Sequence, residues 1–494
     1  MSDLETARLP AERLRRVAID PISRVEGHGK VTLLMDDQLK VRQARLHIVE
    51  FRGFERFIEG RPYEELPVLV QRLCGICPVS HHLAAAKAID QLVGVDTLTP
   101  PAEKLRRLLH LGQVLQSHAL HFFHLASPDL LFGFGSDPRQ RNIIGVLKAR
   151  PEIGLKGIGL RKFGQDIIFK VSGKRVHGTA ALPGGMNQAL GIKAREALLR
   201  EVDGIIEDAA LAVDLARDLY LSDLERHRTF ATVPTSFLGL VGPRGELDLY
   251  HGALRLEDAE GHTLLDDVDY RHYDQHLKEE VRNWTYMKFP YLAQLGADRG
   301  WYRVGPLARL NVARQIDEPR AEAHRRSFLA SGEGGRVHSV LATHWARMIE
   351  LLYAAEGIRT LLNDPDLIGT DLMLKGRPRL RGIGVIEAPR GTLFHDYTVN
   401  EDGLVTRANL IVSTTSNNQA MNESIRQVAD RYFDGREVTE GLLNHIEVAI
   451  RAYDPCLSCA THALGKMPLE LELIDAAGAL VGRLVKDGTG SVHA

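Results

Sequence analysis

The stretch RLCGICPVSHH, residues 72–82, is matched near the other end of the chain by DPCLSCATH, residues 454–462. Together they contain every cysteine of the 494-residue sequence, as two CxxC pairs: Cys74 with Cys77, and Cys456 with Cys459. Each pair offers two thiolates about one helical turn apart, which suits the chelation of one metal ion. A site that uses both pairs requires the two ends of the chain to meet in the fold.

Two other interpretations of the cysteines remain open on spacing alone. One is a four-cysteine zinc site, although structural zinc sites usually close short, locally folded knuckles. Pairs separated by most of the chain favour a site buried at a junction of helices. The other is that each CxxC is an independent redox dithiol. Neither alternative explains the histidines that follow the pairs, His81 and His462.

Composition limits the class of protein. The formal net charge of −2 favours neither a polyphosphate nor an anionic membrane surface, so no nucleic-acid partner is expected. No run of about 18 apolar residues occurs, which predicts no membrane span. Residues 1–20 are charged and lack the apolar core of a secretory signal. We therefore expect a cytoplasmic protein whose cysteines are metal ligands or redox groups rather than disulfides.

Hydrophobic periodicity predicts an α+β fold that is predominantly helical. Alternation around DDQ at 36–38 predicts a small antiparallel sheet within residues 16–50, and EDG at 401–403 predicts a hairpin turn. No repeat or linker marks a domain boundary. Helices are expected at 81–93, 101–126, 193–223, 338–362, 418–432 and 438–451, strands with glycine-rich turns at 239–265, and a last hairpin at 469–485.

Taken in order, RVEGHGK (24–30), RLCGICPVSHH and DPCLSCATH resemble the signature stretches of the large subunit of nickel–iron hydrogenases. The resemblance implies that family's fold, a central helical bundle with peripheral β-hairpins, and the reversible heterolytic cleavage of H2. The related subunit of respiratory complex I shares this fold without the four thiolates, so their retention favours hydrogen chemistry over quinone chemistry. Further matches are VEFRGFERFIEGRP (49–62), ALPGGMN (181–187), YMKFPYL (286–292), YRVGPLARLN (302–311), EAPRGTL (387–393) and STTSNNQAMN (413–422).

The resemblance also implies a role for each cysteine. Cys74 and Cys456 would bind nickel terminally, and Cys77 and Cys459 would bridge nickel to an iron that carries carbon monoxide and cyanide. Splitting H2 into H⁺ and H⁻ needs a Lewis acid and a nearby base. Cys456 is the expected first proton acceptor. Arg390 is the competing candidate, although a guanidinium is a poor base in water.

Other residues are expected around this centre by the same resemblance. Glu26 would carry protons away, because burial can tune a carboxyl for proton transfer; the alternative is an ion pair with Arg24 or with another cation. His28 is expected to be a packed core histidine. The positions near the bridging thiolate or the iron ligands are His81, Pro389 and Asp454, and the magnesium ligands are Glu55, His462 and the backbone carbonyl of Leu410.

A histidine-rich helical stretch stands apart from these motifs. Its histidines are expected to form a packed helix face rather than a metal site. Many relatives carry an acidic residue four positions before the HFFH stretch, where this chain has Ser117, so the hydrogen bonds near Arg390 are expected to differ. The histidines are His110, His118, His121 and His124.

The resemblance implies a single catalytic domain over residues 1–462, followed by a C-terminal extension over residues 463–494. A maturation protease would cut between His462 and Ala463 once nickel-insertion proteins have loaded the site. The alternative is an ordinary C-terminal hairpin that stays in place.

No cysteine remains for an iron–sulfur cluster in this chain, so electrons require an iron–sulfur small subunit. The sequences of the motifs are most similar to those of the cytoplasmic bidirectional type, in which diaphorase subunits with FMN and iron–sulfur clusters reduce NAD⁺. The alternatives are the NADP-linked sulfhydrogenase type, the type coupled to heterodisulfide reductase and, from another class, a structural or assembly protein with a four-cysteine zinc site.

Overall fold

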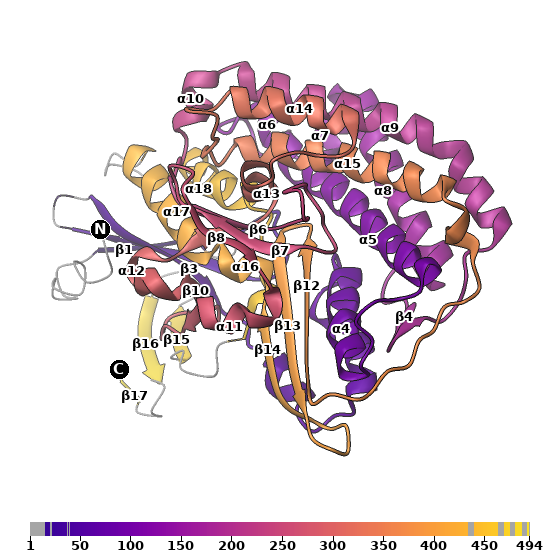
Figure 1. Cartoon of the computed structure of the whole chain (residues 1–494). Coiled ribbons are helices and arrows are strands. Elements are labelled where there is room, and N and C mark those ends of the chain that lie inside the picture. The colour runs from indigo at the N-terminus through magenta and orange to yellow at the C-terminus, as the bar shows by residue number, and fades with distance from the viewer. Residues whose placement is uncertain are drawn as a thin grey trace.

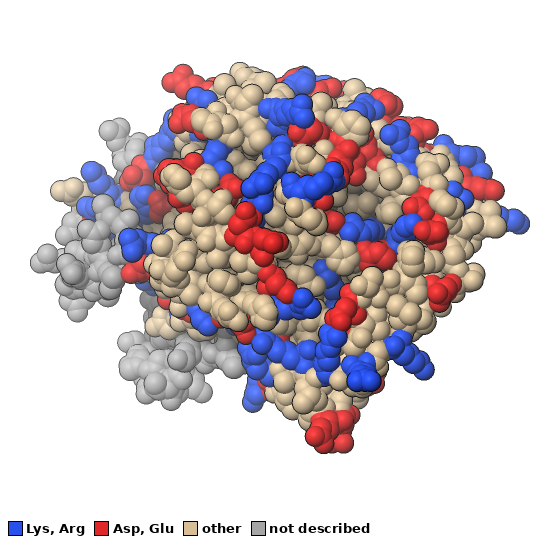
Figure 2. All heavy atoms as spheres, in the orientation of Figure 1, with Lys and Arg blue, Asp and Glu red and all other residues tan. Residues whose placement is uncertain are grey.

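A computed structural model describes residues 15–19, 22–36, 38, 40–432, 439–462, 469–474, 480–486 and 492–493. Long helices stack on one side of the molecule, and small sheets gather on the other (Figure 1). The α+β, predominantly helical class is confirmed. Lysine and arginine alternate with aspartate and glutamate over the visible face, without a large patch of one sign (Figure 2). Among the described residues, no helix is both long and apolar enough to cross a bilayer.

The bundle is built from α4 (Pro78–Leu92), α5 (Pro100–Leu120), α8 (Pro151–Ser172), α9 (Ile192–Leu221) and α15 (Ala342–Asn363). Helix α5 packs against α8 and α15, and α15 also packs against α9. Helix α15 is buried on nearly every face, as expected for a helix at the centre of a bundle. Close packing of α5 and α8 depends on glycine, since a Cβ on Gly164 would lie 2.6 Å from the carbonyl oxygen of Gly112.

The expected N-terminal sheet is confirmed. Strands β1 (Arg15–Ile19), β2 (Gly29–Met35) and β3 (Val41–Ile48) form an antiparallel sheet in sequence order. Its buried side chains include Val31, Leu33 and Leu46, and β3 lies along α17 (Asn418–Tyr432).

A second antiparallel sheet lies directly against α4. It consists of β12 (Arg381–Ala388), β13 (Gly391–Val399) and β14 (Val405–Ile411). A Cβ on Gly382 or Gly384 would lie 2.0 Å from a backbone carbonyl of α4, so the strand can approach the helix only with glycine there. The turn from β12 to β13 contains Pro389 and Arg390, which places these residues beside the N-terminus of α4.

The other elements surround these two layers. A third sheet has the order β11-β6-β7-β8, with β11 (Tyr302–Arg303), β6 (Ser236–Val241), β7 (Ala253–Glu257) and β8 (Thr263–Val268). The shorter helices are α2 (Phe54–Ile58), α3 (Leu66–Leu69), α6 (Ser127–Phe132), α7 (Ile143–Ala149), α10 (Leu224–Thr229), α11 (Tyr273–His276), α12 (Gly296–Arg299), α14 (Pro319–Ala330) and α16 (Ser413–Ser416). The remaining strands are β4 (Ala181–Leu182), β5 (Gly185–Met186), β9 (Leu277–Glu280), β10 (Phe289–Leu292), β15 (Leu469–Ile474), β16 (Leu480–Lys486) and β17 (Val492–His493).

The long helices expected from periodicity are present, and α5 continues into a π-helical turn, η4 (His121–Ala126). Strands β15 and β16 pair as the expected antiparallel hairpin after His462.

Candidate metal centre

The first cysteine pair stands between the short helix η3 (Val70–Leu73) and α4. Cys74 is extended, Cys77 is the N-cap of α4, and Pro78 occupies the first helical position, where its missing N–H costs nothing. The amides of Ile76 and Cys77 each donate to Cys74 Sγ at 3.2 Å. Backbone donors at a helix start favour a thiolate over a thiol.

The second pair follows α18 (Glu440–Ala452), where Asp454 takes a left-handed conformation with φ 54° and turns the chain inward. The Leu457 amide donates to the Glu26 carbonyl at 2.9 Å, and a parallel bridge joins Glu26 to Cys456. The Cys456 amide donates to Thr414 Oγ1 at 2.9 Å. The N-terminal and C-terminal parts of the chain therefore meet at the cysteines.

The four cysteine sulfurs form one buried cluster. The Sγ atoms of Cys74 and Cys456 lie 3.2 Å apart, those of Cys456 and Cys459 3.0 Å apart, and those of Cys77 and Cys459 3.8 Å apart. All four ligand atoms lie within 4.8 Å of one another. This closeness favours one shared site over two separate dithiols.

The thiols differ in how readily they ionise. Burial raises the pKa of Cys456 and Cys459 well above the usual thiol value. Burial also opposes ionisation of Cys74, yet hydrogen bonds from the Cys456 and Cys459 thiols hold the pKa of Cys74 well below its usual value. A soft metal cation would take the place of the shared protons, so this donor set fits nickel and iron.

Arg390 lines the same small cavity as Cys77, Cys456 and Cys459. Its Nε donates to the Asp454 carbonyl at 2.6 Å, and its Nη2 donates to Asp454 Oδ1 at 2.9 Å. Its Nη1 is buried without a partner. Burial opposes the charge, but Asp454 and the cysteines raise the pKa of Arg390 well above its usual value. Arg390 is therefore a cationic donor, which weakens its candidacy as a base.

A small cavity beside the sulfurs is lined in one corner by Arg390, whose buried Nη1 has no partner. This polar corner suits small ligands that accept hydrogen bonds. The lining residues are Cys77, Ser80, His81, Ala388, Pro389, Arg390, Leu393, Val412, Ser413, Thr414, Cys456 and Cys459.

Arg309, a fully buried residue of α13 (Pro306–Val312), hydrogen-bonds the backbone of the segment Ala388–Arg390. Two guanidinium nitrogens donate to Glu350 at 2.6 Å each, and Nη1 donates to Glu387 at 2.8 Å. The Ala388 carbonyl accepts at 2.9 Å and the Pro389 carbonyl at 3.4 Å. These five hydrogen bonds use all five donors of the guanidinium. Arg309 thus fixes the backbone that presents Arg390.

Glu26 contacts the cluster directly. Its Oε2 accepts from Cys456 Sγ at 3.0 Å and from the Ser458 amide at 3.1 Å. The side chain is half-buried, so it joins the cluster to the protein surface. The alternative ion pair with Arg24 is not formed, because Arg24 pairs with Asp129 at 2.6 Å.

The three expected magnesium ligands lie in one region. Both ring nitrogens of His462 are buried without a hydrogen-bond partner. Burial lowers the pKa of His462, and the nearby charge of Glu55 opposes this shift. Leu410 contacts Glu55 through its amide, at 2.8 Å from Oε1. Lys288 donates to the Glu55 carboxylate at 2.9 and 3.2 Å, a contact that sequence reasoning missed although YMKFPYL contains this lysine.

His81 is fully buried and contacts His395 Nε2 through Nδ1 at 3.1 Å. Burial lowers the pKa of His81 to about 4, so its ring is neutral. His82 had no expected role. Its Nδ1 lies 2.8 Å from the Pro67 carbonyl, and its Nε2 accepts from the amides of residues 180 and 181. The prediction for His28 was wrong: its side chain is exposed and contacts Glu50 at 2.5 Å, because the RVEGH loop bends around its glycine and points this ring outward.

The histidines of α5 and η4 are packed, as expected. His118 bonds to Glu350 at 3.0 Å, and His121 bonds to the Arg451 carbonyl at 2.7 Å. Among the described residues they belong to no metal-ligand group. Ser117 is buried, and its hydroxyl has no partner.

Comparison with known proteins agrees with this geometry. A family model described as nickel-dependent hydrogenase matches residues 52–131 and 249–462, and a model described as HoxL-like matches residues 16–51. The chain therefore belongs to the nickel-dependent hydrogenase family and is a nickel–iron hydrogenase large subunit. Membership implies a nickel–iron centre.

Particular relatives refine the comparison. The NAD-reducing hydrogenase HoxS subunit beta of Cupriavidus necator is 47% identical, over 94% of this chain and 99% of its own length. One chain of the F420-non-reducing hydrogenase of Methanothermobacter marburgensis is 40% identical, over 95% of this chain and all of its own length. A crystal structure of an NAD⁺-reducing [NiFe]-hydrogenase in the H2-reduced state has a TM-score of 0.89 and 56% identity, covering 91% of this chain and 99% of that one.

Proposed function

We propose that this chain cleaves H2 heterolytically at a nickel–iron centre held by its four cysteines, with Cys74 and Cys456 terminal on nickel and Cys77 and Cys459 bridging. The observation that carries the proposal is the cluster of four buried sulfurs within 4.8 Å, formed from both ends of the chain. When bound, the centre supplies the Lewis acidity that polarises H2. The zinc alternative lacks a reason for Glu26 and Arg390 to contact the same cluster.

The residues of the chain hold and move the proton. Cys456 is the proposed first acceptor, because its sulfur is bonded to the Glu26 carboxylate at 3.0 Å. A proton on Cys456 can pass to Glu26 along this contact without rearrangement of the backbone. Half-buried Glu26 then releases it outward. Arg390, as a cation, stabilises negative charge at the cluster and donates rather than accepts.

Iron ligands of the carbon monoxide and cyanide type fit the polar corner of the small cavity. Arg390 Nη1 is a buried donor without a protein partner, and a cyanide nitrogen accepts hydrogen bonds. Pro389 and Leu393 add apolar surface to the same wall, against which a carbon monoxide ligand can pack. Asp454 and His81 would orient the surroundings of the iron and of the bridging Cys77.

A magnesium ion bound by Glu55, His462 and the Leu410 backbone is also part of the proposal. It is supported by the two unpartnered ring nitrogens of His462 and by the carboxylate beside them. A hard cation accepts carboxylate, carbonyl and water oxygens. Lys288 would shift away from Glu55 when the cation binds.

We infer that residues 463–494 are an extension removed after His462, which leaves a catalytic domain of residues 1–462. The match to the family model ends at residue 462, which supports this boundary. Nickel-insertion proteins and a maturation protease follow as partners. A cytoplasmic location stays a prediction.

The proposed electron path leads to an iron–sulfur small subunit, then to diaphorase subunits that reduce NAD⁺. Its support is that the relatives at 47% and 56% identity are named as NAD-reducing enzymes. Relatives named F420-non-reducing hydrogenase and sulfhydrogenase are 40% and 29% identical, so an NADP-linked or heterodisulfide-reductase-coupled path is the second candidate.

An infrared spectrum of the complex from its native host tests the centre. Metal-bound carbonyl and cyanide stretches, with nickel and iron in equal amounts, are expected from a chain ending at His462. Zinc alone, without these bands in that processed chain, would overturn the hydrogenase proposal. The electron path is tested separately by the acceptor that the purified complex reduces with H2.

A further inference from the structure

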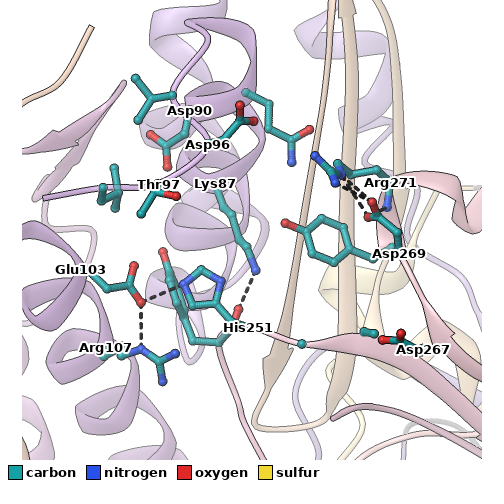
Figure 3. A pocket seen from close by; sticks show the side chains of 17 residues that line it. Lys87, Asp90, Asp96, Thr97, Glu103, Arg107, His251, Asp267, Asp269 and Arg271 are labelled. Atoms are coloured by element: carbon teal, nitrogen blue, oxygen red, sulfur yellow. Dashed lines mark hydrogen bonds and ion pairs between the residues drawn. The ribbon is translucent and has the colours of Figure 1, made fainter. Parts of the chain in front are cut away.

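A second, larger cavity lies between the helices α4 and α5 and the segment that runs from Tyr250 into β7. Its volume is about 820 Å³, the size of a small-molecule site. It shares no lining residue with the small cavity at the cysteines. Its lining residues are Lys87, Asp90, Gln91, Val95, Asp96, Thr97, Leu98, Glu103, Arg107, Tyr250, His251, Gly252, Ala253, Asp267, Asp269, Tyr270 and Arg271 (Figure 3).

The amine of Lys87 lies in the middle of this group, between the Glu103–His251 contact and the Arg271–Asp269 ion pair (Figure 3). Lys87 is only 6% exposed. Its Nζ donates to the Tyr250 carbonyl at 2.6 Å and to the Val385 carbonyl at 2.8 Å. An ammonium has three donors, so the two carbonyls leave one N–H for the cavity.

No carboxylate pairs with Lys87 among the described residues, although five carboxylates line the cavity. Four of the five are engaged by arginine, and the fifth, Asp267, is exposed. Arg107 is shared between Glu103 and Asp248, so Lys87 feels the carboxylates of this network only at a distance and has none in direct contact. The ion pairs are Asp90 with Arg106 at 2.5 Å, Asp96 with Arg379 at 2.6 Å, Glu103 with Arg107 at 2.8 Å and Asp269 with Arg271 at 2.6 Å.

A buried ammonium without a counterion is costly, and proteins usually pair such a charge. Carbonyl oxygens and the ring faces of Tyr270 and Tyr250, at 4.7 and 5.2 Å, compensate only in part. Burial lowers the pKa of Lys87 to about 8, which agrees with incomplete compensation.

We propose that this cavity binds a small molecule through an oxyanion group, a carboxylate or a phosphate, with the Lys87 amine as its anchor. The oxyanion accepts the third N–H of Lys87 and neutralises its charge. The remaining volume takes the rest of the molecule between the Glu103–Arg107 and Asp269–Arg271 pairs. Proton chemistry at the cysteines does not require this site.

Competitive acetylation of the assembled hydrogenase tests the proposal. Acetic anhydride at pH 8 modifies amines that are unprotonated and accessible, and mass spectrometry of peptides gives the rate at each lysine. Inorganic phosphate and acetate are the two probes, compared with potassium chloride at equal ionic strength. At ten times its Kd a probe leaves about a tenth of the sites free, so the rate at Lys87 should fall about tenfold. Lys148, an exposed lysine of α7, is the internal control and should not change.

The two probes distinguish the sources of the oxyanion. Protection by phosphate alone assigns a phosphate ester, and protection by acetate alone assigns a carboxylic acid. Equal rates at Lys87 with both probes and with chloride would overturn the proposal. A Lys87 that is unreactive in every buffer would also overturn it, because a partner subunit would then fill the cavity.

A crystal of the same complex soaked in selenate gives an independent check. Anomalous scattering should place selenium beside Lys87 Nζ in the wild-type enzyme and in K148M, and not in K87M. Selenium at exposed arginines only would contradict the site. The wild-type result does not depend on K87M, whose loss of two carbonyl contacts can impair folding.

Discussion

Substituting Arg309 by lysine should disturb the position of Arg390 without changing any of the four cysteine ligands. Lysine keeps the positive charge but has three donors in place of five. At least two hydrogen bonds to Glu350, Glu387 or the Ala388–Pro389 carbonyls are therefore lost. At about 1.5–3 kcal/mol for each bond to a charged group, R309K should lose roughly 3–6 kcal/mol of stability.

The position of Arg390 should change as well. The carbonyls of Ala388 and Pro389 lose their fixed donor, so Arg390 Nη1 is no longer held at one place beside the cluster. We expect shifted or broadened carbonyl and cyanide infrared bands in the R309K enzyme, together with lower H2 oxidation. Urea unfolding midpoints measure the loss of stability in the same samples.

Arg106 provides a matched control. It is also a fully buried arginine, on α5, and it bonds Asp90 at 3.0 Å and the Gly185 carbonyl at 2.9 Å, away from the cysteines. R106K should lower the urea midpoint and leave the infrared bands unchanged. If R309K lowers stability and its bands also stay at the wild-type positions, the reasoning is refuted and Arg309 serves the fold alone.

Three further outcomes are expected. Replacing Glu26 by glutamine keeps the acceptor for the Ser458 amide but removes the proton carrier, so H2 oxidation should fall by about 100- to 10,000-fold while nickel and iron contents stay equal; an unchanged rate would exclude Glu26 from the route. E55Q removes the proposed carboxylate ligand, and metal analysis should find magnesium lost with nickel retained; magnesium at wild-type content would refute the site. Burial raises the pKa of Glu318 to about 7. As pH rises from about 4.5 to about 7, the carboxyl ionises in the unfolded state but stays protonated in the folded state, so the free energy of unfolding falls. E318Q should therefore raise the urea midpoint at pH 8 and leave it unchanged at pH 4, whereas equal effects at both pH values would contradict the assignment.

That the two CxxC pairs share one site could be predicted from local motifs, whereas a zinc site and separate dithiols stayed open until the family resemblance was considered. Periodicity likewise predicted the long helices and the N-terminal sheet. Contacts between distant segments were not predictable in this way. Arg309 stands 78 positions from Glu387, and its five bonds depend on how α13 meets β12. The contact between Lys288 and Glu55 was missed for the same reason, since nothing near a lysine in sequence specifies its partner carboxylate.

The prediction for His28 was wrong for a related reason. In RVEGHGK the glycine at position 27 has φ 84°, and a Cβ there would lie 2.7 Å from the Ser458 amide. The loop must bend where it meets the second CxxC, which directs Glu26 towards Cys456 and the next side chain to the surface. A pattern of residue types does not state which side of such a bend faces inward.

The same bend explains why the cysteines can stand at opposite ends of the chain. Glu26 and Cys456 are joined by a backbone bridge, so the proton carrier reaches its donor only when the C-terminal segment docks on the N-terminal loop. Cys74 and Cys77 need only η3 and α4, which are local in sequence. Closing the sulfur cluster and placing Glu26 therefore depend on the same docked segment. The four sulfurs lie within 4.8 Å of one another in a chain that still carries residues 463–494, so closing the cluster does not require removal of the proposed extension.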